Sequence, residues 1–203
     1  MFITIEGTDG AGKTTLINLL KSSFSDTSDV LFTREPGGTE LGEKIRQLLF
    51  ELDETKVYAL TEAYLFAAAR AQHVAEVIIP ALQQGVLVIS DRFLDSAIAY
   101  QGGGRKIGEH VVDELNYYAV SNIEPDLTIF LDISPKEGLN RIHSHRSNEF
   151  NRMDDEDVEF YIATKQAYEQ RIKDNPERFV IIDATKSKEE IFNQAFMAIK
   201  RVI

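Results

Sequence analysis

The chain opens with an apolar run, a glycine-rich loop and a segment of helical period, in that order. Phe2 to Ile5 predicts a strand, and the loop after it reads Gly7, four residues, Gly12, Lys13 and Thr14. This is the Walker A pattern G-x-x-x-x-G-K-[ST]. Its glycines let backbone N–H groups curl around phosphate oxygens at the positive end of the helix that starts near Lys13. The start of the chain is therefore predicted to be a phosphate-binding loop.

The rest of the chain alternates short apolar runs with helical periods. Further strands are predicted at Val30 to Thr33, Val86 to Ser90, Leu127 to Leu131 and Phe179 to Ile182. Helices are predicted at Lys13 to Phe24, Leu41 to Phe50, Thr61 to Gln84, Val111 to Val120, Pro135 to Ile142, Glu156 to Lys173 and Lys188 to Val202. Strands that are apolar on both faces are typical of a parallel sheet covered by helices. We expect an α/β three-layer P-loop fold with about five parallel strands, in one domain over residues 1–203.

Composition excludes several classes of protein. The 203 residues hold 22 Lys and Arg against 33 Asp and Glu, a net charge of −11, with 4 His and no Cys. An acidic chain of this kind argues against a nucleic-acid or membrane surface, so an anionic substrate must meet locally positive charge. Disulfides and thiolate metal sites are excluded. No apolar run reaches the ~20 residues of a membrane span and the start does not resemble a signal peptide, so a cytoplasmic protein is expected.

A phosphoryl-transfer site of this type needs a lysine and a metal site. Lys13 would reach the β and γ phosphates of ATP, and Thr14 would ligate Mg²⁺. An acid at the end of a second strand would complete the metal site, and either Asp91 or Asp132 fits. Asp91 is favoured because Arg92 follows it and supplies charge for a second phosphate. Asp132 has a simpler interpretation as part of the start of the next helix, which has Pro135 in its first turn.

The other arginines indicate a second phosphorylated ligand. Arg34 and Arg92 lie at the carboxyl ends of predicted strands, which open onto the crevice beside the loop. Arg70 follows Phe66 by four residues on the long helix, so a ring and a hydrogen-bonding head share one side, as a nucleobase site requires. Phe66 alone is as readily interpreted as a core residue. Arg46 could add charge near the acceptor but is more readily interpreted as a solvated helical residue.

Other P-loop proteins fit less well. The chain has no Asn-Lys-x-Asp motif for guanine and lacks the GxGxxG and His-Arg-Asp signatures of protein kinases. A P-loop ATPase that switches a protein partner remains possible, although it would leave the three arginines unexplained. Two polar or glycine-rich stretches, Gln101 to Gly108 and His143 to Met153, are predicted to be mobile functional loops.

At this point the residues resemble a family, the thymidylate (dTMP) kinases, in their bacterial form. The matching runs are Phe2 to Thr15, Thr33 to Thr39, Glu62 to Arg70, Asp91 to Ser96, Ala99 to Gly102, Pro125 to Thr128 and Leu131-Asp132. The resemblance implies transfer of the ATP γ-phosphoryl group to dTMP in dTTP biosynthesis, with Mg²⁺, by a homodimer. Another nucleoside monophosphate kinase stays open as an alternative.

The resemblance also implies roles for individual residues. The ATP-binding set is Gly7, Asp9, Gly10, Ala11, Gly12, Lys13, Thr14, Thr15 and Arg141, the last of these stacking on adenine. The acceptor set is Asp9, Arg34, Glu35, Phe66, Arg70, Arg92, Ser96, Tyr100 and Gln101. Phe66 would stack on thymine, while Arg70, Ser96 and Gln101 would hydrogen-bond its edges. Arg34 and Arg92 would hold the dTMP phosphate. Asp9 and Glu35 would line the sugar, and Tyr100 would exclude ribose.

Two sequence features show how this chain compares with the family that it resembles. The variable loop positions Thr8 to Ala11 carry no basic residue, so the extra catalytic charge is expected from Arg146 and Arg152 in a lid at about residues 143–153. Phe93 follows Arg92 where relatives usually place Tyr or His, so a hydrogen bond at that position is lost. The expected catalytic set is Lys13, Asp91, Arg92, Arg146 and Arg152.

Overall fold

Five strands form one parallel sheet, as expected. The computed structural model describes residues 1–25, 27, 29–51, 57–145 and 156–203. The strands are β1 (Phe2–Glu6), β2 (Val30–Arg34), β3 (Leu87–Asp91), β4 (Leu127–Asp132) and β5 (Phe179–Asp183). They lie in the order β2-β3-β1-β4-β5, all parallel. The phosphate-binding loop therefore leaves the sheet at its central strand.

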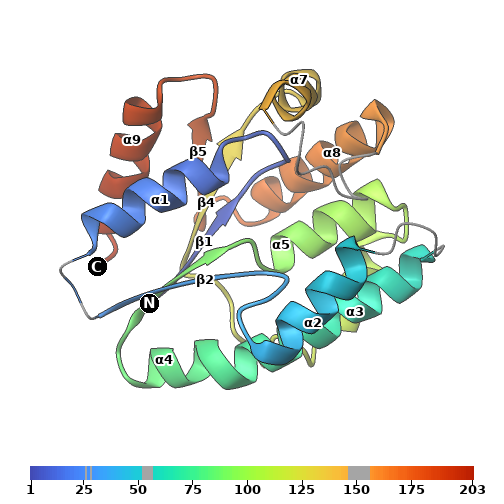
Figure 1. The fold of residues 1–203 in the computed structure, drawn as a ribbon, viewed down its shortest axis with the longest axis horizontal. Coiled ribbons are helices and arrows are strands. Elements are labelled where there is room, and N and C mark those ends of the chain that lie inside the picture. Colours follow the sequence, from blue (N-terminus) through green and yellow to red (C-terminus); the bar gives the residue numbers. More distant parts are fainter. Residues whose placement is uncertain (26, 28, 52–56, 146–155) are drawn as a thin grey trace.

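Helices cover both faces of this sheet (Figure 1). The helices are α1 (Lys13–Ser23), α2 (Glu40–Phe50), α3 (Ala59–His73), α4 (Ile79–Gln83), α5 (Leu94–Ala97), α6 (Glu109–Asn116), α7 (Pro135–His145), α8 (Val158–Asp174) and α9 (Lys188–Lys200), with π-helices η1 (Val74–Ile78) and η2 (Ile98–Gly104). The three-layer α/β prediction is confirmed.

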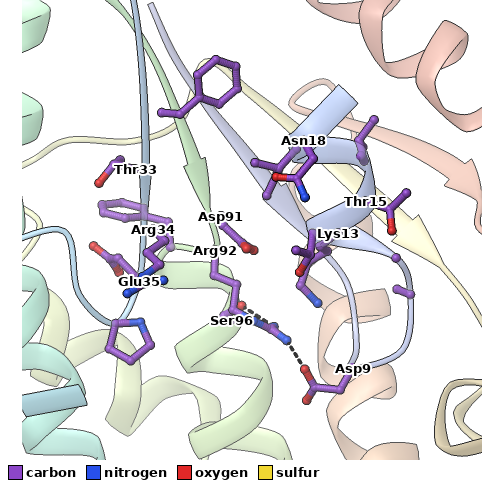
Figure 2. A pocket seen from close by; sticks show the side chains of 18 of the residues that line it. Asp9, Lys13, Thr15, Asn18, Thr33, Arg34, Glu35, Asp91, Arg92 and Ser96 are labelled. Atoms are coloured by element: carbon purple, nitrogen blue, oxygen red, sulfur yellow. Dashed lines mark hydrogen bonds and ion pairs between the residues drawn. The ribbon is translucent and has the colours of Figure 1, made fainter. Parts of the chain in front are cut away.

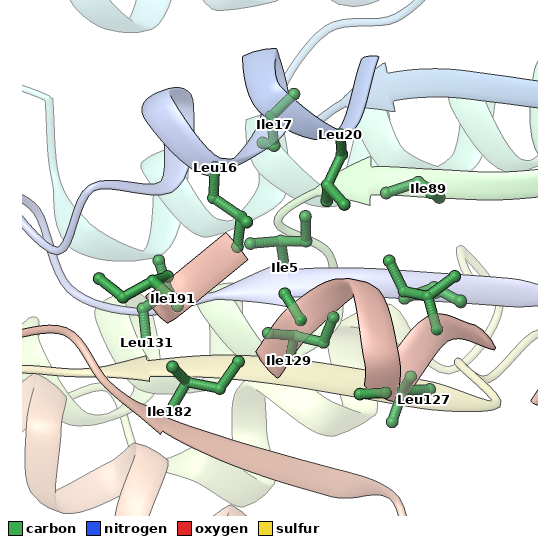
Figure 3. Packing of buried hydrophobic residues seen from close by; sticks show 14 of the residues in the cluster. Ile5, Leu16, Ile17, Leu20, Ile89, Leu127, Ile129, Leu131, Ile182 and Ile191 are labelled. Carbon is green, nitrogen blue, oxygen red and sulfur yellow. The ribbon is translucent and has the colours of Figure 1, made fainter. Parts of the chain in front are cut away.

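Alternate residues of each strand point to opposite faces, and each face has its own core. Ile5, Ile89 and Ile129 pack beneath α1 and α9, where Leu20 and Ile191 meet them (Figure 3). The opposite face is packed by Phe2 and Val88 against η1, and by Phe130 against α8. Both faces are buried, which explains why the strands read as continuous apolar runs.

The strand predictions are confirmed, and each strand extends one residue beyond its prediction. The added residues are Glu6, Arg34, Asp91, Asp132 and Asp183, all of them charged. Hydrophobic patterning ends where the apolar run ends, but the backbone ladder continues. The carboxyl edge of the sheet is therefore lined with charge.

The long predicted helix at 61–84 is interrupted by a π-helix. Ala59 to Gln83 runs continuously as α3, η1 and α4, with η1 directly before Pro80. Pro80 has no N–H to donate, and a π-turn accommodates that loss. By length and composition alone this run passes as a membrane span, with 33% of its best window buried. Val74 and Ile78 pack against Phe2, however, which is the packing of a core helix.

The prediction of a mobile loop at Gln101 to Gly108 is wrong for its first half. Residues through Gly104 belong to η2, which is largely buried and packs along α8. A Cβ added at Gly104 would lie 2.5 Å from a ring atom of Phe160. Glycine here allows two backbones to approach closely, so the residue that suggested mobility produces tight packing. The short helix α5 before it was also not predicted.

Candidate active site

The carboxyl ends of β2 and β3 and the loop after β1 open onto one cavity of about 1280 Å³. Its wall includes the phosphate-binding loop, the exposed turns of α1, and parts of α2, α3 and η2. This is the position at which ligands bind open parallel sheets. Cationic side chains predominate on the wall: Lys13, Lys21, Arg34, Arg46, Arg70, Arg92, Arg141, Lys186 and Lys188. An acidic chain thus presents the locally positive surface that its sequence predicted.

Lys13 begins α1 and is folded back over the loop. Its Nζ donates to the carbonyl oxygens of Gly7 at 2.9 Å and Thr8 at 3.0 Å. The side chain is buried, and burial, followed by the nearby charge of Arg92, lowers the Lys13 pKa to about 8. The first turn of α1 holds no acidic residue, so an anion meets the helix N-terminus and the ammonium together.

Arg92 is the most heavily bonded side chain in the cavity. Its guanidinium donates to Asp9 Oδ1 at 2.6 Å (Figure 2). It also donates to the Gly7 carbonyl at 3.1 Å and to the Tyr100 hydroxyl at 3.0 Å. Tyr100 in turn donates to Asp9 Oδ2 at 2.8 Å. The backbone of Arg92 has a φ of 68°, in the region that non-glycine residues rarely adopt. This conformation turns the guanidinium toward the phosphate-binding loop.

Asp91 suits a metal site better than Asp132 does. Among the described residues, Oδ1 of Asp91 and Oδ1 of Asp132 are both buried without a hydrogen-bond partner, but of these two acids Asp91 alone lies on the cavity wall with Thr14. Asp132 is outside that wall and forms an ion pair with Lys165 at 2.9 Å. A buried carboxylate oxygen left unpaired is costly unless a ligand satisfies it.

Two expected base-contacting side chains are each bound to a buried glutamate. Arg70 Nε donates to Glu35 Oε2 at 2.7 Å. Gln101 Nε2 donates to Glu62 Oε1 at 3.1 Å, and Glu62 also accepts from Arg105 Nε at 3.0 Å. The sequence analysis assigned no role to Glu62. Its signal was an acid directly before the apolar run 63–69, because such a residue must find a partner when buried.

Phe66 and Arg46 both line the cavity. Phe66 is half-buried on the wall, and the described hydrophobic clusters do not include it, so its interpretation as a core residue is not supported. Arg46 donates to the Pro36 carbonyl at 3.0 Å and lies 4.7 Å from the centre of the Phe50 ring. The interpretation of Arg46 as a solvated surface residue is wrong, because it is partly enclosed beside the arginines of the site.

Most of the expected site residues lie on this one wall. They are Asp9, Gly10, Ala11, Gly12, Lys13, Thr14, Thr15, Arg34, Glu35, Phe66, Arg70, Asp91, Arg92, Ser96, Tyr100, Gln101 and Arg141. Gly7 contributes its carbonyl behind the wall. Arg146 and Arg152 lie outside the described residues, and the predicted loop's first residues form the last turn of α7.

Ser96 and Phe93 differ in setting from what their roles would suggest. The Ser96 hydroxyl donates to Glu6 and accepts from Arg92 at 3.0 Å, so its expected contact with a base edge stays a prediction. The Phe93 ring is fully buried against Phe2, with ring centres 4.9 Å apart. An apolar ring suits that position, and the Phe93 backbone carbonyl bonds to Arg70.

Glu6 is a buried carboxyl directly beneath Arg92. It accepts from the Phe93 N–H at 2.8 Å and from the Tyr168 hydroxyl at 2.8 Å. Burial, followed by the nearby Asp95 carboxylate, raises the Glu6 pKa from 4.5 to about 7. The folded chain therefore retains a proton on Glu6 at pH values where the unfolded chain has lost it.

We expect this proton to make folding stability depend on pH. The stabilising contribution of Glu6 to the free energy of unfolding is fully present below pH 4.5 and is lost as the pH rises through about 7. Glu6→Gln, which stays neutral, should therefore raise the melting temperature relative to the parent more at pH 8 than at pH 5. Calorimetry across this range measures the difference, with the exposed Glu177→Gln as the matched control. Parallel profiles for Glu6→Gln and the parent would contradict the shift.

Comparisons with known proteins agree on one family. The family model described as thymidylate kinase matches residues 5–195. The thymidylate kinase of Limosilactobacillus reuteri (strain DSM 20016) is 46% identical over 193 residues, covering 94% of this chain and 91% of the relative. That of Oenococcus oeni is 47% identical over 201 residues, covering 98% and 94%. A crystal structure of thymidylate kinase from Ehrlichia chaffeensis superposes with a TM-score of 0.79 at 34% identity, covering 98% of each chain.

Proposed function

The chain belongs to the thymidylate kinase family and phosphorylates dTMP in nucleotide biosynthesis, and we propose that this reaction takes place in the single cavity described above. The observation that carries this assignment to residues is that the Walker A lysine and the acceptor-side arginines line the same wall. The phosphates of ATP and dTMP can therefore lie next to each other in one cavity.

The donor side is assigned to the loop after β1 and its neighbours. Backbone N–H groups from Asp9 to Thr15 and the Lys13 ammonium would hold the ATP phosphates. Arg141 lines the same cavity and donates to the Ala184 carbonyl at 3.0 Å, which fixes its guanidinium beside the start of α9. A guanidinium held in this way can stack on adenine.

The metal site is assigned to Thr14 and Asp91. A hydroxyl and a carboxylate suit Mg²⁺, which prefers oxygen ligands, and the unpartnered Oδ1 of Asp91 is the observation that supports the fit. Bound there with ATP, Mg²⁺ would neutralise charge that develops on the β and γ phosphates.

The acceptor side is assigned to the wall opposite the loop. Arg34 and Arg92 would hold the dTMP phosphate, and Phe66 would stack on thymine. Arg70 would donate to the base edges, where Gln101 and Ser96 would donate or accept. Asp9 and Glu35 would line the sugar, and the Tyr100 ring, whose hydroxyl donates to Asp9 at 2.8 Å, would leave no room for a ribose hydroxyl. Burial raises the pKa of the Tyr100 phenol, which keeps it a hydrogen-bond donor.

The chemical step is a displacement at phosphorus. An oxygen of the dTMP phosphate bonds to the γ phosphorus of ATP, while the bond from that phosphorus to the β–γ bridging oxygen breaks, giving dTDP and ADP. Charge accumulates on the transferring group, and Lys13 and Arg92 lie where they would neutralise it. The lid at about residues 143–153 would add Arg146 or Arg152.

Arg146→Ala or Arg152→Ala should then lower kcat with little change in KM, and normal kcat in both would contradict that role.

A homodimer is also proposed, formed through α2, α3 and α6. These neighbouring helices and the residues directly flanking α3 and α6 expose large apolar side chains: Leu41, Leu48, Tyr58, Leu60, Tyr64, Val111, Tyr117 and Tyr118. A second copy of the chain would cover such a surface. Sedimentation of the chain as a monomer would contradict it. A cytoplasmic location is proposed as well, and the burial of Arg70 and His73 supports the assignment of the α3 run as a core helix rather than a membrane span.

The assigned acceptor site predicts a separation of KM values. Arg70→Ala and Gln101→Ala should each raise KM for dTMP about tenfold or more, because a buried base edge loses its partner. KM for ATP should stay nearly constant. The measurement is ADP release from Mg-ATP with dTMP and with each other nucleoside monophosphate as acceptor. An equal rise in both KM values would remove these residues from the acceptor site. A preference for another base would favour a different monophosphate kinase, and acceptor-independent ADP release would favour an ATPase.

A further inference from the structure

A single buried carboxylate supports Arg70 and is itself held by a histidine. Glu35, at 5% exposure, follows β2. Its Oε2 accepts from Arg70 Nε at 2.7 Å, and its Oε1 faces His73 Nδ1 at 2.9 Å. Arg70 and His73 lie one turn apart on α3, so they share a face of the helix. Glu35 therefore bridges two successive turns of the helix that forms the acceptor wall.

The imidazole of His73 is fixed on its other side as well. Its Nε2 lies 2.6 Å from the Thr33 hydroxyl, and the side chain is fully buried. Because the Glu35 carboxylate accepts, Nδ1 donates to it, and Nε2 is left within hydrogen-bond distance of the Thr33 hydroxyl. A Cβ added at Gly38 would lie 2.6 Å from the ring. The loop between β2 and α2 thus closes over the imidazole.

Arg70 is immobilised by the same surroundings. Besides Glu35 it donates to Asn116 Oδ1 at 2.5 Å and to the Phe93 carbonyl at 3.2 Å. These bonds use three of the five N–H groups of a guanidinium. The side chain is only 2% exposed, yet it forms part of the cavity wall. The bonds to Glu35, Asn116 and Phe93 therefore hold the guanidinium in one orientation at this wall.

We propose that His73, together with Thr33, is a positioning residue for recognition of the acceptor base. It holds the Glu35 carboxylate, and through it the Arg70 guanidinium, at the place where the base edge is met. This rests on the proposed function, because it takes Arg70 as a donor to the base. His73 is enclosed and does not line the cavity, so it acts only through Glu35. Without His73, Glu35 can rotate. Substrate binding must then supply the free energy that orders Arg70, which weakens binding.

The test compares variants that remove one hydrogen bond at a time. His73→Phe keeps a ring but loses both bonds, and should raise KM for dTMP about tenfold. Thr33→Val removes only the hydroxyl and should act in the same direction by a smaller factor. His73→Asn retains a donor near the Nδ1 position and should recover part of the loss. KM for ATP should change less than twofold throughout. The exposed His110→Phe is the matched control.

The decisive readout is selectivity, because a merely structural role would not move it. We expect the ratio of kcat/KM for dTMP to that for dCMP to fall in His73→Phe and to recover in His73→Asn, with melting temperatures measured alongside. If Thr33→Val and His73→Phe lower the melting temperature but leave this ratio and KM for dTMP unchanged, the positioning role is overturned. Arg70→Ala in the same assays tests the positioning role of His73 separately from the proposed acceptor site. A raised KM in Arg70→Ala alone would overturn the role of His73 and leave the proposed acceptor site intact. An unchanged KM in Arg70→Ala would overturn both.

Discussion

Replacing Lys13 by methionine is expected to reduce phosphoryl transfer about 10²-fold or more while leaving the chain folded. The ammonium lies at the N-terminus of α1, where the phosphates of the donor would sit, and a charge aimed at a transferring group acts mainly in the transition state. Methionine keeps the apolar stem. It also removes a buried charge whose pKa is lowered to about 8, so the melting temperature at pH 7 should not fall.

Steady-state rates of ADP formation, with and without dTMP, measure the effect of Lys13→Met. Lys44→Met is the control, because Lys44 is exposed on α2 and pairs with Glu40 in a surface ion pair. Near-normal turnover in folded Lys13→Met would remove the Walker A assignment.

Arg92→Lys should have a comparable effect, although it keeps the positive charge. Lysine cannot reproduce the planar fork that reaches Asp9, Tyr100 and the Gly7 carbonyl together. We expect kcat/KM for dTMP to fall about 10²-fold, since in the proposed site the acceptor phosphate and the transferring group would lose the guanidinium that holds them. Arginine and lysine at position 92 would both have to adopt the φ of 68°. The substitution therefore changes the head group without changing the backbone strain.

The measurement for Arg92→Lys is kcat/KM for dTMP at saturating ATP, with melting temperature as the check on folding. Arg201→Lys, at the exposed end of the chain, is the matched control. A loss confined to the melting temperature would show that Arg92 organises Asp9 and Tyr100 without contacting substrate.

The fold was largely predictable because its strands are buried on both faces. Continuous apolar runs located all five strands, and the helical period of hydrophobic residues located most of the helices. The misses have physical causes. A charged residue ends each strand, and hydrophobicity cannot locate a residue placed there by the backbone ladder. In η2 the glycine-rich sequence reads as a loop, but close packing of Gly104 on Phe160 decides its structure.

The site was predictable where a motif or resemblance names residues, and not where partners are distant in sequence. The loop, Asp91, Arg70 and Gln101 came from short runs, and the structure brings them to one cavity. Arg46 was discounted because nothing in its helix signals that Pro36 and Phe50 enclose it. His73 and Glu62 were passed over for the same reason: burial turns an isolated polar residue into a paired one, and only the fold supplies the partner.

The continuity of the cavity has a consequence for inhibition. Arg141, Lys13 and Phe66 line one cavity, so in the proposed site a compound that joins an adenosine and a thymidine through one chain of phosphates would occupy both ends. Such a compound loses its translational freedom once rather than twice, and the second end binds at the high local concentration set by the linker. Its affinity should therefore depend steeply on the number of linking phosphates, with an optimum at the length that matches the path along the wall.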